Sequence, residues 1–185
     1  VMSPPILHHI PADSAKEAFM CQTGAILPYI GAILGYIPDN PADKAIADQL
    51  MMNCIDLTAE VVKAFHPVDP AAGYLSQKEA ADKAASAFAK KRLMVWLSHL
   101  EKIVRRLRPE GDGPLLGRAT YADFVLFHLL GGMETSFDKP EFGNAWSNAK
   151  VPTLKKLKAW MEARPNIAKY LKSDRRRPWE GTSLM

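Results

Sequence analysis

The chain has 185 residues, of which 48% are hydrophobic and 24% charged, and its formal net charge is +4. These proportions are those of a globular protein with a sizeable core, and no internal repeat or low-complexity tract appears. No apolar run reaches the length needed to cross a bilayer, and no charged start followed by an apolar core marks a signal peptide. We therefore expect a cytoplasmic protein that does not act at a membrane.

Much of the positive charge lies near the end of the chain, at Lys169, Lys172 and residues 175–177. A basic cluster of this kind can bind nucleic acid or a membrane surface. Cations are also favoured in the last turn of a helix, where free carbonyls carry partial negative charge. We prefer this second interpretation and expect no nucleic-acid partner.

The cysteines and histidines do not form a metal or redox motif. Cys21 and Cys54 lie apart in apolar stretches and are expected to be buried free thiols in a reducing compartment. His66, His99 and His128 are scattered along the chain and have no metal-ligand spacing. The sequence therefore predicts no metal site.

The first elements that the sequence predicts are two short strands and a helix. Residues 5–10 and 17–21 are strand-like runs separated by a polar turn, which indicates a β-hairpin. Two strands alone are marginally stable in water, so they need further cover. A helix follows, with Thr23 as a candidate cap and an apolar face from Ala25, and it ends near Gly35.

From Pro41 onward the pattern is helical. Apolar residues recur at three- and four-residue steps, which aligns them along one face of each helix. The predicted helices cover residues 46–65, 88–107, 120–132, 154–161 and 165–172. The fold class is therefore mainly α, with a partial α/β piece over residues 1–36 followed by an all-α domain over residues 42–185.

The run Thr120-Tyr121-Ala122-Asp123 precedes an apolar stretch and has the pattern of a helix capping box, with Asp in place of the usual Glu. We expect the Thr120 hydroxyl to accept from the backbone N–H of Asp123. We also expect the Asp123 carboxylate to accept from the N–H of Thr120. This cap explains Asp123 without a catalytic role.

Four motifs occur in order and together resemble the cytosolic glutathione S-transferases. They are Pro5-Ile6-Leu7, the run of residues 22–27 with Tyr29, the capping region of residues 115–123, and residues 164–171. The most similar members are the sigma-like and related tyrosine-type classes. The resemblance implies that residues 1–36 are the remnant of a thioredoxin-like domain that binds glutathione, with Pro5 as its cis-proline. It also implies that residues 42–185 form the helical C-terminal domain.

The resemblance assigns glutathione binding to Gln22 and Thr23. At the start of a helix, free N–H groups and the positive end of the dipole attract an anion, here the γ-glutamyl carboxylate of glutathione. The Thr23 hydroxyl and N–H are expected to bind that carboxylate, and the Gln22 amide to contact the same moiety. The alternative is a plain helix cap at Thr23 and an ordinary strand end at Gln22.

Three further residues take roles from the resemblance. Pro4 precedes the cis-proline and is expected to contact the cysteinyl part of glutathione through its carbonyl, because proline has no N–H to donate. Some members carry Gln at the position of Ser3, so the sequence departs from them there. Asp56 is expected to reach across a dimer interface to the γ-glutamyl ammonium, or else to be a solvated helix carboxylate. Trp179 is expected either to line the pocket for the electrophile or to pack.

The implied activity is conjugation of the glutathione thiolate to small, apolar, electrophilic substrates by a cytoplasmic homodimer, as in detoxification. Glutathione is then the co-substrate. The Tyr, Ser or Cys that activates the thiol is expected upstream of Val1, which makes the sequence either a piece of a longer enzyme or a natural short form. Two alternatives are a non-catalytic binding or scaffold protein on the same fold and a purely helical interaction module.

Overall fold

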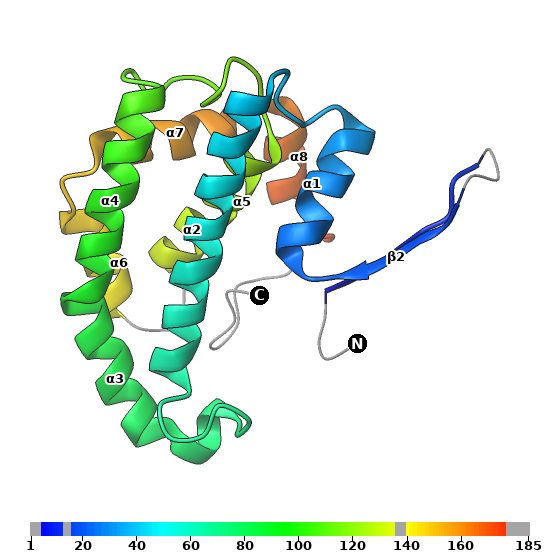
Figure 1. Cartoon of the computed structure of the whole chain (residues 1–185). Helices are drawn as coiled ribbons and strands as arrows, with labels where there is room; N and C mark the ends of the chain where they lie inside the picture. The colour runs from blue at the N-terminus through cyan, green and yellow to red at the C-terminus, as the bar shows by residue number, and fades with distance from the viewer. Residues whose placement is uncertain (1–4, 13–15, 136–139, 177–185) are drawn as a thin grey trace.

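The computed structural model describes residues 5–12, 16–135 and 140–176 (Figure 1). It begins with a β-hairpin in which β1 (Ile6–His9) pairs antiparallel with β2 (Ala18–Cys21). Ile6 lies opposite Cys21 and His8 opposite Phe19, so these four side chains share one face. That face is open, because Ile6 is 50% and Phe19 63% exposed. The predicted hairpin is confirmed.

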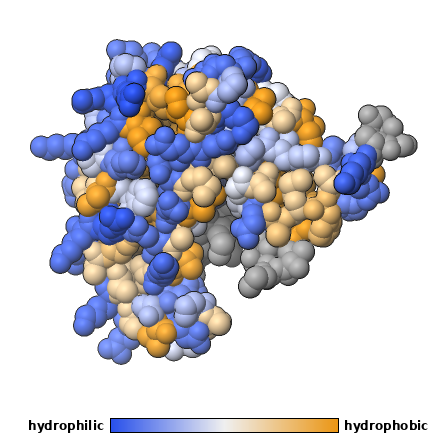
Figure 2. All heavy atoms as spheres, in the orientation of Figure 1, coloured by the Kyte–Doolittle hydropathy of each residue, from blue (hydrophilic) through white to orange (hydrophobic). Residues whose placement is uncertain are grey.

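Helix α1 (Thr23–Leu34) follows the hairpin directly and lies between it and the other helices (Figure 1). It ends at Gly35, whose φ of 75° is in the left-handed region that favours glycine. Although α1 is almost entirely apolar, only Ile26 and Gly31 are buried in it. Ile33 and Leu34 are 51% and 61% exposed. Figure 2 shows apolar surface gathered over α1 and the adjoining hairpin.

Helix α2 (Pro41–Phe65) confirms the long apolar repeat of the sequence. The side chain of Asn40 caps it by accepting from the N–H of Asp43 at 2.9 Å, and Pro41 takes the first turn, where no amide donor is needed. The buried face holds Leu50, Cys54, Leu57, Val61 and Phe65, which are 1% exposed or less.

The helix predicted over residues 88–107 is interrupted, and this prediction is corrected. Helix α3 (Lys78–Lys90) follows a short 3₁₀ turn, η1 (Tyr74–Gln77), and ends before Lys91. Helix α4 (Arg92–Leu107) begins after it. Both helices bury their apolar faces in the same core, so the three- and four-residue steps continue through the break. Such a break leaves no trace in the spacing of the apolar residues.

Helix α5 (Tyr121–Thr135) runs past its predicted end at Gly131 and Gly132, and α6 (Pro140–Asn148) is a helix that the sequence pattern did not predict. Gly132 is buried, and glycine in a helix is tolerated where packing outweighs its lower propensity. The last described helices, α7 (Pro152–Ala163) and α8 (Pro165–Leu171), lie where the sequence places them.

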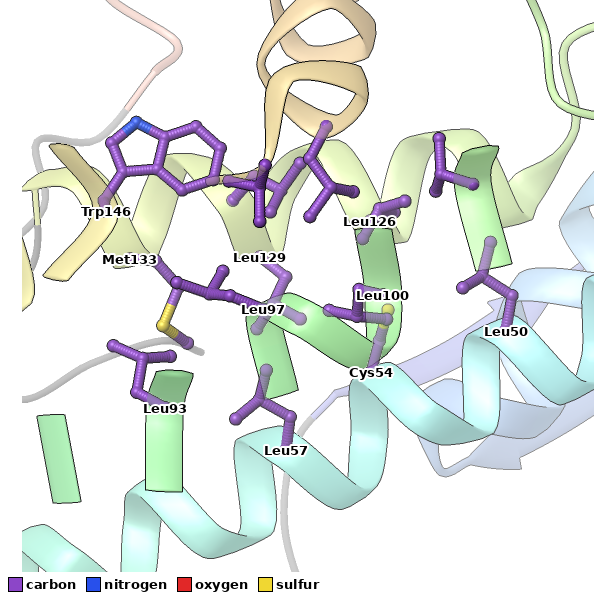
Figure 3. Close-up of a cluster of buried hydrophobic side chains, with 14 of the residues drawn as sticks. Leu50, Cys54, Leu57, Leu93, Leu97, Leu100, Leu126, Leu129, Met133 and Trp146 are labelled. Carbon is purple, nitrogen blue, oxygen red and sulfur yellow. The ribbon is translucent and has the colours of Figure 1, made fainter. Parts of the chain in front are cut away.

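The core lies mainly between α2, α4, α5 and α6 (Figure 3), and buried residues of α3 and α7 complete it. Leucines of α2 and α4 face Leu126, Leu129 and Met133 of α5, and Trp146 of α6 closes one end (Figure 3). Cys54 is part of this core, and burial raises the pKa of its thiol to about 12. Cys21 is only half-buried at the end of β2, so the expectation of a buried thiol holds for Cys54 alone.

No helix in the described ranges combines the length and the apolar character needed to cross a membrane.

Candidate functional site

The junction between β2 and α1 has an unusual backbone. Gln22 stands between the strand and the helix with φ 77° and ψ 115°, and it is the only non-glycine residue with positive φ in the described part of the chain. Such a conformation costs about 1–3 kcal/mol and persists only when the surrounding structure imposes it. The carbonyl of Gln22 accepts from the N–H groups of Ala25 at 2.9 Å and Ile26 at 3.0 Å. These bonds fix the strained residue to the first turn of α1.

Gln22, rather than Thr23, occupies the N-cap position, which corrects the expected cap. Thr23 is the first helical residue and is half-buried, and Gln22 makes no side-chain cap bond. The first N–H groups of a helix have no partner within it, and no acidic side chain lies in this first turn. The junction therefore presents backbone donors and the positive end of the helix dipole together, which suits a carboxylate.

Close packing on α2 seats the junction. A Cβ built on Gly24 would lie 3.2 Å from the Cδ1 atom of Ile55 and 3.9 Å from the Sδ atom of Met52. A methyl group at position 24 would therefore require the end of the Ile55 side chain to shift by a few tenths of an ångström. Asp56 follows Ile55 in this turn of α2 and is exposed. The structure thus brings the turn that bears Asp56 next to the Gln22–Thr23 junction.

The hairpin is tied to α1 by a pair that the sequence argument did not anticipate. The Nδ1 atom of His9 and the hydroxyl of Tyr29 are hydrogen-bonded at 2.8 Å. His8, on the other face of the hairpin, pairs instead with the Glu17 carboxylate at 2.9 Å. The two neighbouring histidines thus have different partners, as alternation on a strand requires.

The capping box differs in one bond from its expected form. The Asp123 carboxylate accepts from the Thr120 N–H at 2.8 Å, from the Thr120 hydroxyl at 3.0 Å and from the Leu115 N–H at 3.0 Å. The Thr120 hydroxyl therefore donates to the carboxylate, while the Asp123 N–H donates to the Thr120 carbonyl at 3.0 Å. Burial raises the pKa of Asp123, and the three bonds act against this rise. Asp123 thus joins the loop before α5 to the start of that helix.

Of the remaining residues singled out in the sequence, Pro5 lies within the described structure and three others do not. Pro5 is exposed and directly precedes β1. Ser3, Pro4 and Trp179 lie outside the described residues. Across the described ranges, no three side chains of the His, Cys, Asp and Glu types come together to hold a metal ion.

An open hollow lies elsewhere in the described structure, on the outer face of α4. It has a volume of about 430 Å³ and is lined by Met94, Val95, Ser98, His99 and Lys102. None of the predicted site residues lines it. Sequence reasoning gave no reason to expect it, because its lining comes from the polar and mixed face of α4.

Arg118 is a further residue that the sequence argument passed over. Its guanidinium reaches the Gly35 carbonyl at 2.6 Å and the Asp39 carboxylate at 2.9 Å. Both partners are about 80 residues away in the sequence, with separations of 83 and 79 positions. The only signal available in advance was its position beside the capping box.

The chain has the fold of known glutathione transferases. It superposes on a Pi-class glutathione S-transferase of Onchocerca volvulus with a TM-score of 0.66 and 21% identity, covering 86% of this chain and 67% of that one. It superposes on a sigma-class glutathione S-transferase of Fasciola hepatica with a TM-score of 0.67 and 20% identity, covering 92% of this chain and 73% of that one. A glutathione transferase of Burkholderia graminis, solved with two glutathione molecules per subunit, gives 0.58 and 20%, with coverage of 90% and 65%.

The chain therefore spans about two thirds of the length of these structures. A search of the curated proteins by sequence gives no match. The family model for the glutathione S-transferase C-terminal domain matches residues 63–174, which is more than half of the chain. With that match and the shared fold, the chain belongs to the glutathione S-transferase family.

Proposed function

We propose that this chain binds glutathione at the Gln22–Thr23 junction and supplies that site to an enzyme that conjugates glutathione to small, apolar electrophiles. The observation that carries the proposal is the strained Gln22, with φ 77°, held at the head of a helix whose first turn contains no acid. Strained residues of this kind cluster at functional sites, where the surrounding structure holds them. The Burkholderia graminis relative, which has glutathione bound, supports the choice of ligand.

Five residues have proposed roles in binding glutathione or the electrophile. The N–H and hydroxyl of Thr23 bind the γ-glutamyl carboxylate, and the Gln22 amide contacts the same end of the ligand. Pro4 contributes its carbonyl to the cysteinyl part. Asp56 pairs with the γ-glutamyl ammonium held by the partner subunit, and an opposite charge at hydrogen-bond distance stabilises that cation. Trp179 lines the pocket for the electrophile.

The homodimer is proposed to form through the outer face of α2 and α4. Met52 and Val95 are 49% and 56% exposed there, so both are available to pack against a second copy of the chain. Asp56 is exposed on the same helix as Met52. Sedimentation equilibrium tests this part directly, because a charged residue at position 95 is expected to weaken the dimer. We place this dimer in the cytoplasm, in keeping with the free thiols of Cys21 and Cys54.

Catalysis requires that the thiol of glutathione be deprotonated near neutral pH. None of the described side chains is assigned this role. Conjugation, and a place in detoxification, are therefore proposals, and the chain covers about two thirds of the length of its structural relatives.

Isothermal titration with glutathione tests the binding proposal. Thr23→Ala is expected to weaken binding about tenfold, the loss of a hydrogen bond to a charged group, whereas Thr23→Ser keeps the hydroxyl and should bind as the parent does. Thr58→Ala is a matched control, since the Thr58 hydroxyl bonds only the Cys54 carbonyl within α2 among the described contacts. Equal affinity in the parent and Thr23→Ala would overturn the assignment.

A conjugation assay with a chromogenic electrophile then separates two outcomes. Turnover supports the transferase. Glutathione binding without turnover supports instead a binding or scaffold protein on this fold, which is the second candidate.

A further inference from the structure

Arg118 connects the loop before α5 to the end of α1. Its Nη2 atom donates to the Gly35 carbonyl at 2.6 Å, and its Nη1 atom donates to the Asp39 carboxylate at 2.9 Å. The planar guanidinium presents donors in a fixed fork, so it holds two acceptors at once in one geometry. The Gly35 carbonyl lies at the negative end of the α1 dipole, where a cation is favoured.

Other contacts gather at the same end of α1. The Tyr121 N–H donates to the Tyr36 carbonyl at 3.0 Å. The rings of Tyr36 and Phe124 meet edge to face, with centroids 5.0 Å apart. A Cβ built on Gly31 would lie 2.9 Å from the Cδ1 atom of Tyr121, so α1 approaches α5 as closely as a glycine allows. The C-terminal end of α1 is therefore docked on the first residues of α5.

Toward its N-terminus α1 is held against the other helices by apolar packing: Gly24 lies against Ile55, and Ile26 is buried. In the described contacts, the hydrogen bonds that tie this segment to α5 and the loop before it come from Gly35 and Tyr36, at its C-terminal end. From Gly35 back to Thr23 the helix is about 18 Å long, so a tilt of about 10° at the docked end moves Thr23 by about 3 Å. A displacement of that size removes hydrogen bonds to a bound ligand.

We propose that Arg118 is a positioning residue for the glutathione site: it seats the C-terminal end of α1 on α5 and thereby sets where the Gln22–Thr23 junction stands. The effect of Arg118 on glutathione binding rests on the proposed function. Its effect on the position of α1 does not. The Asp39 carboxylate is 76% exposed, so the ion pair contributes little to stability by itself. Its effect is on the orientation of α1.

Hydrogen–deuterium exchange of the chain tests the seating of α1. In Arg118→Ala, peptides covering residues 25–34 should exchange at least about tenfold faster, because local opening of α1 no longer breaks the Arg118 bonds. Peptides of α2 and of α5 beyond its first turn should keep their parental rates. Unchanged rates in α1, or an equal rise in all three helices, would overturn the proposal, since the second result describes general destabilisation.

Glutathione titration supplies the second readout. If about one molecule in ten of Arg118→Ala keeps α1 seated, its apparent affinity falls about tenfold. Arg118→Lys keeps the charge near the Gly35 carbonyl without the fork, so its affinity and exchange should lie between those of the parent and Arg118→Ala. Should Arg118→Ala fail to fold, Arg118→Lys carries the same comparison.

Arg108→Ala is the matched control. Arg108 pairs with Asp112 at 3.2 Å, and its side chain is 43% exposed against 46% for Arg118, but its partners lie in the loop after α4. Exchange in α1 should not respond to this change. If the parental chain itself does not bind glutathione, the proposed function fails, and the exchange comparison still decides whether Arg118 seats α1.

Discussion

The carboxylate of Glu101, in the middle of α4, accepts a hydrogen bond from the backbone N–H of Leu154 at 2.9 Å. It also accepts from the N–H of Thr153 at 3.0 Å, and the side chain is 8% exposed. Helix α7 has no cap from its own N-cap side chain and no acid in its first turn. Glu101 therefore supplies from another helix the negative charge that the start of α7 favours.

Replacing Glu101 should destabilise the fold. Glu101→Ala leaves two buried donors without a partner and should lower the free energy of unfolding by about 2–4 kcal/mol. Glu101→Gln keeps one acceptor and should cost about half as much. Urea denaturation measures both, with Glu110→Ala in the exposed loop after α4 as the control. Equal stability of Glu101→Ala and the control would contradict the capping role.

The Tyr121 hydroxyl donates to the Asp48 carboxylate at 2.5 Å, and Lys44 pairs with the same carboxylate at 2.7 Å. Burial acts to raise the pKa of Asp48, but the bonds from Lys44 and Tyr121 bring it below its usual value. The stability that this group contributes is thus present above the unfolded pKa of about 4 and is lost as the pH falls through the lower folded value.

The pKa of Tyr121 is raised by burial and by the Asp48 carboxylate. A raised pKa means that the folded state holds the proton more tightly, so stability falls as the pH rises past the unfolded value of about 10. Tyr121→Phe should lower the stability at pH 7 by about 1 kcal/mol and make it less sensitive to pH between about 9.5 and 11. Thermal unfolding across this range checks both effects; a variant that keeps the parental slope would exclude Tyr121 as its source.

Gly31 should tolerate no side chain. A Cβ at this position would lie 2.9 Å from the Cδ1 atom of Tyr121 and 3.1 Å from the Tyr36 carbonyl oxygen. Gly31→Ala should therefore cost about 1–3 kcal/mol despite the better helix propensity of alanine, because either α1 or Tyr121 must shift. At Gly73 a Cβ would meet nothing within 4 Å, so Gly73→Ala is the matched control. A stabilised Gly31→Ala would show that α1 does not dock this closely.

The two thiols should react at very different rates. Cys54 is 1% exposed, and burial raises the pKa of its thiol to about 12, so it presents almost no thiolate at neutral pH. Cys21 is half-buried at the end of β2. Titration with an aromatic disulfide reagent at pH 8 should therefore modify one thiol in the native protein and two in guanidinium. Cys21→Ser should abolish the native reaction, and rapid modification of both thiols would contradict the burial of Cys54.

The sequence predicted the elements that depend on local signals. The apolar repeat of α2, the prolines that begin α7 and α8, and the run from Thr120 to Asp123 are readable because propensity, caps and burial agree there. The break at Lys91 was not predicted, because α3 and α4 on either side of it bury their apolar faces in the same core. Helix α6 was not predicted because it has only nine residues, contains Gly143, and begins with Pro140 and ends with Asn148, which together resemble a loop.

The candidate site was predictable in composition but not in geometry. The residue types at Gln22 and Thr23 suggested an anion site, yet the left-handed backbone of Gln22 is imposed by its surroundings, and nothing local requires it. The contact between Arg118 and Gly35 spans 83 positions and leaves no periodic trace in a single sequence. Long-range polar contacts of this kind are not visible in a single sequence.

The hairpin has a consequence for how this molecule meets other chains. In the described part of the structure, β1 and β2 pair only with each other, so each retains one edge of backbone donors and acceptors. A strand added at such an edge has to match the spacing of the backbone donors and acceptors. Its register then depends on the side chains of the hairpin, which point alternately to opposite faces, as Ile6 and Leu7 do. A strand that pairs with the hairpin must therefore match the spacing of its backbone groups, and its side chains add a second requirement.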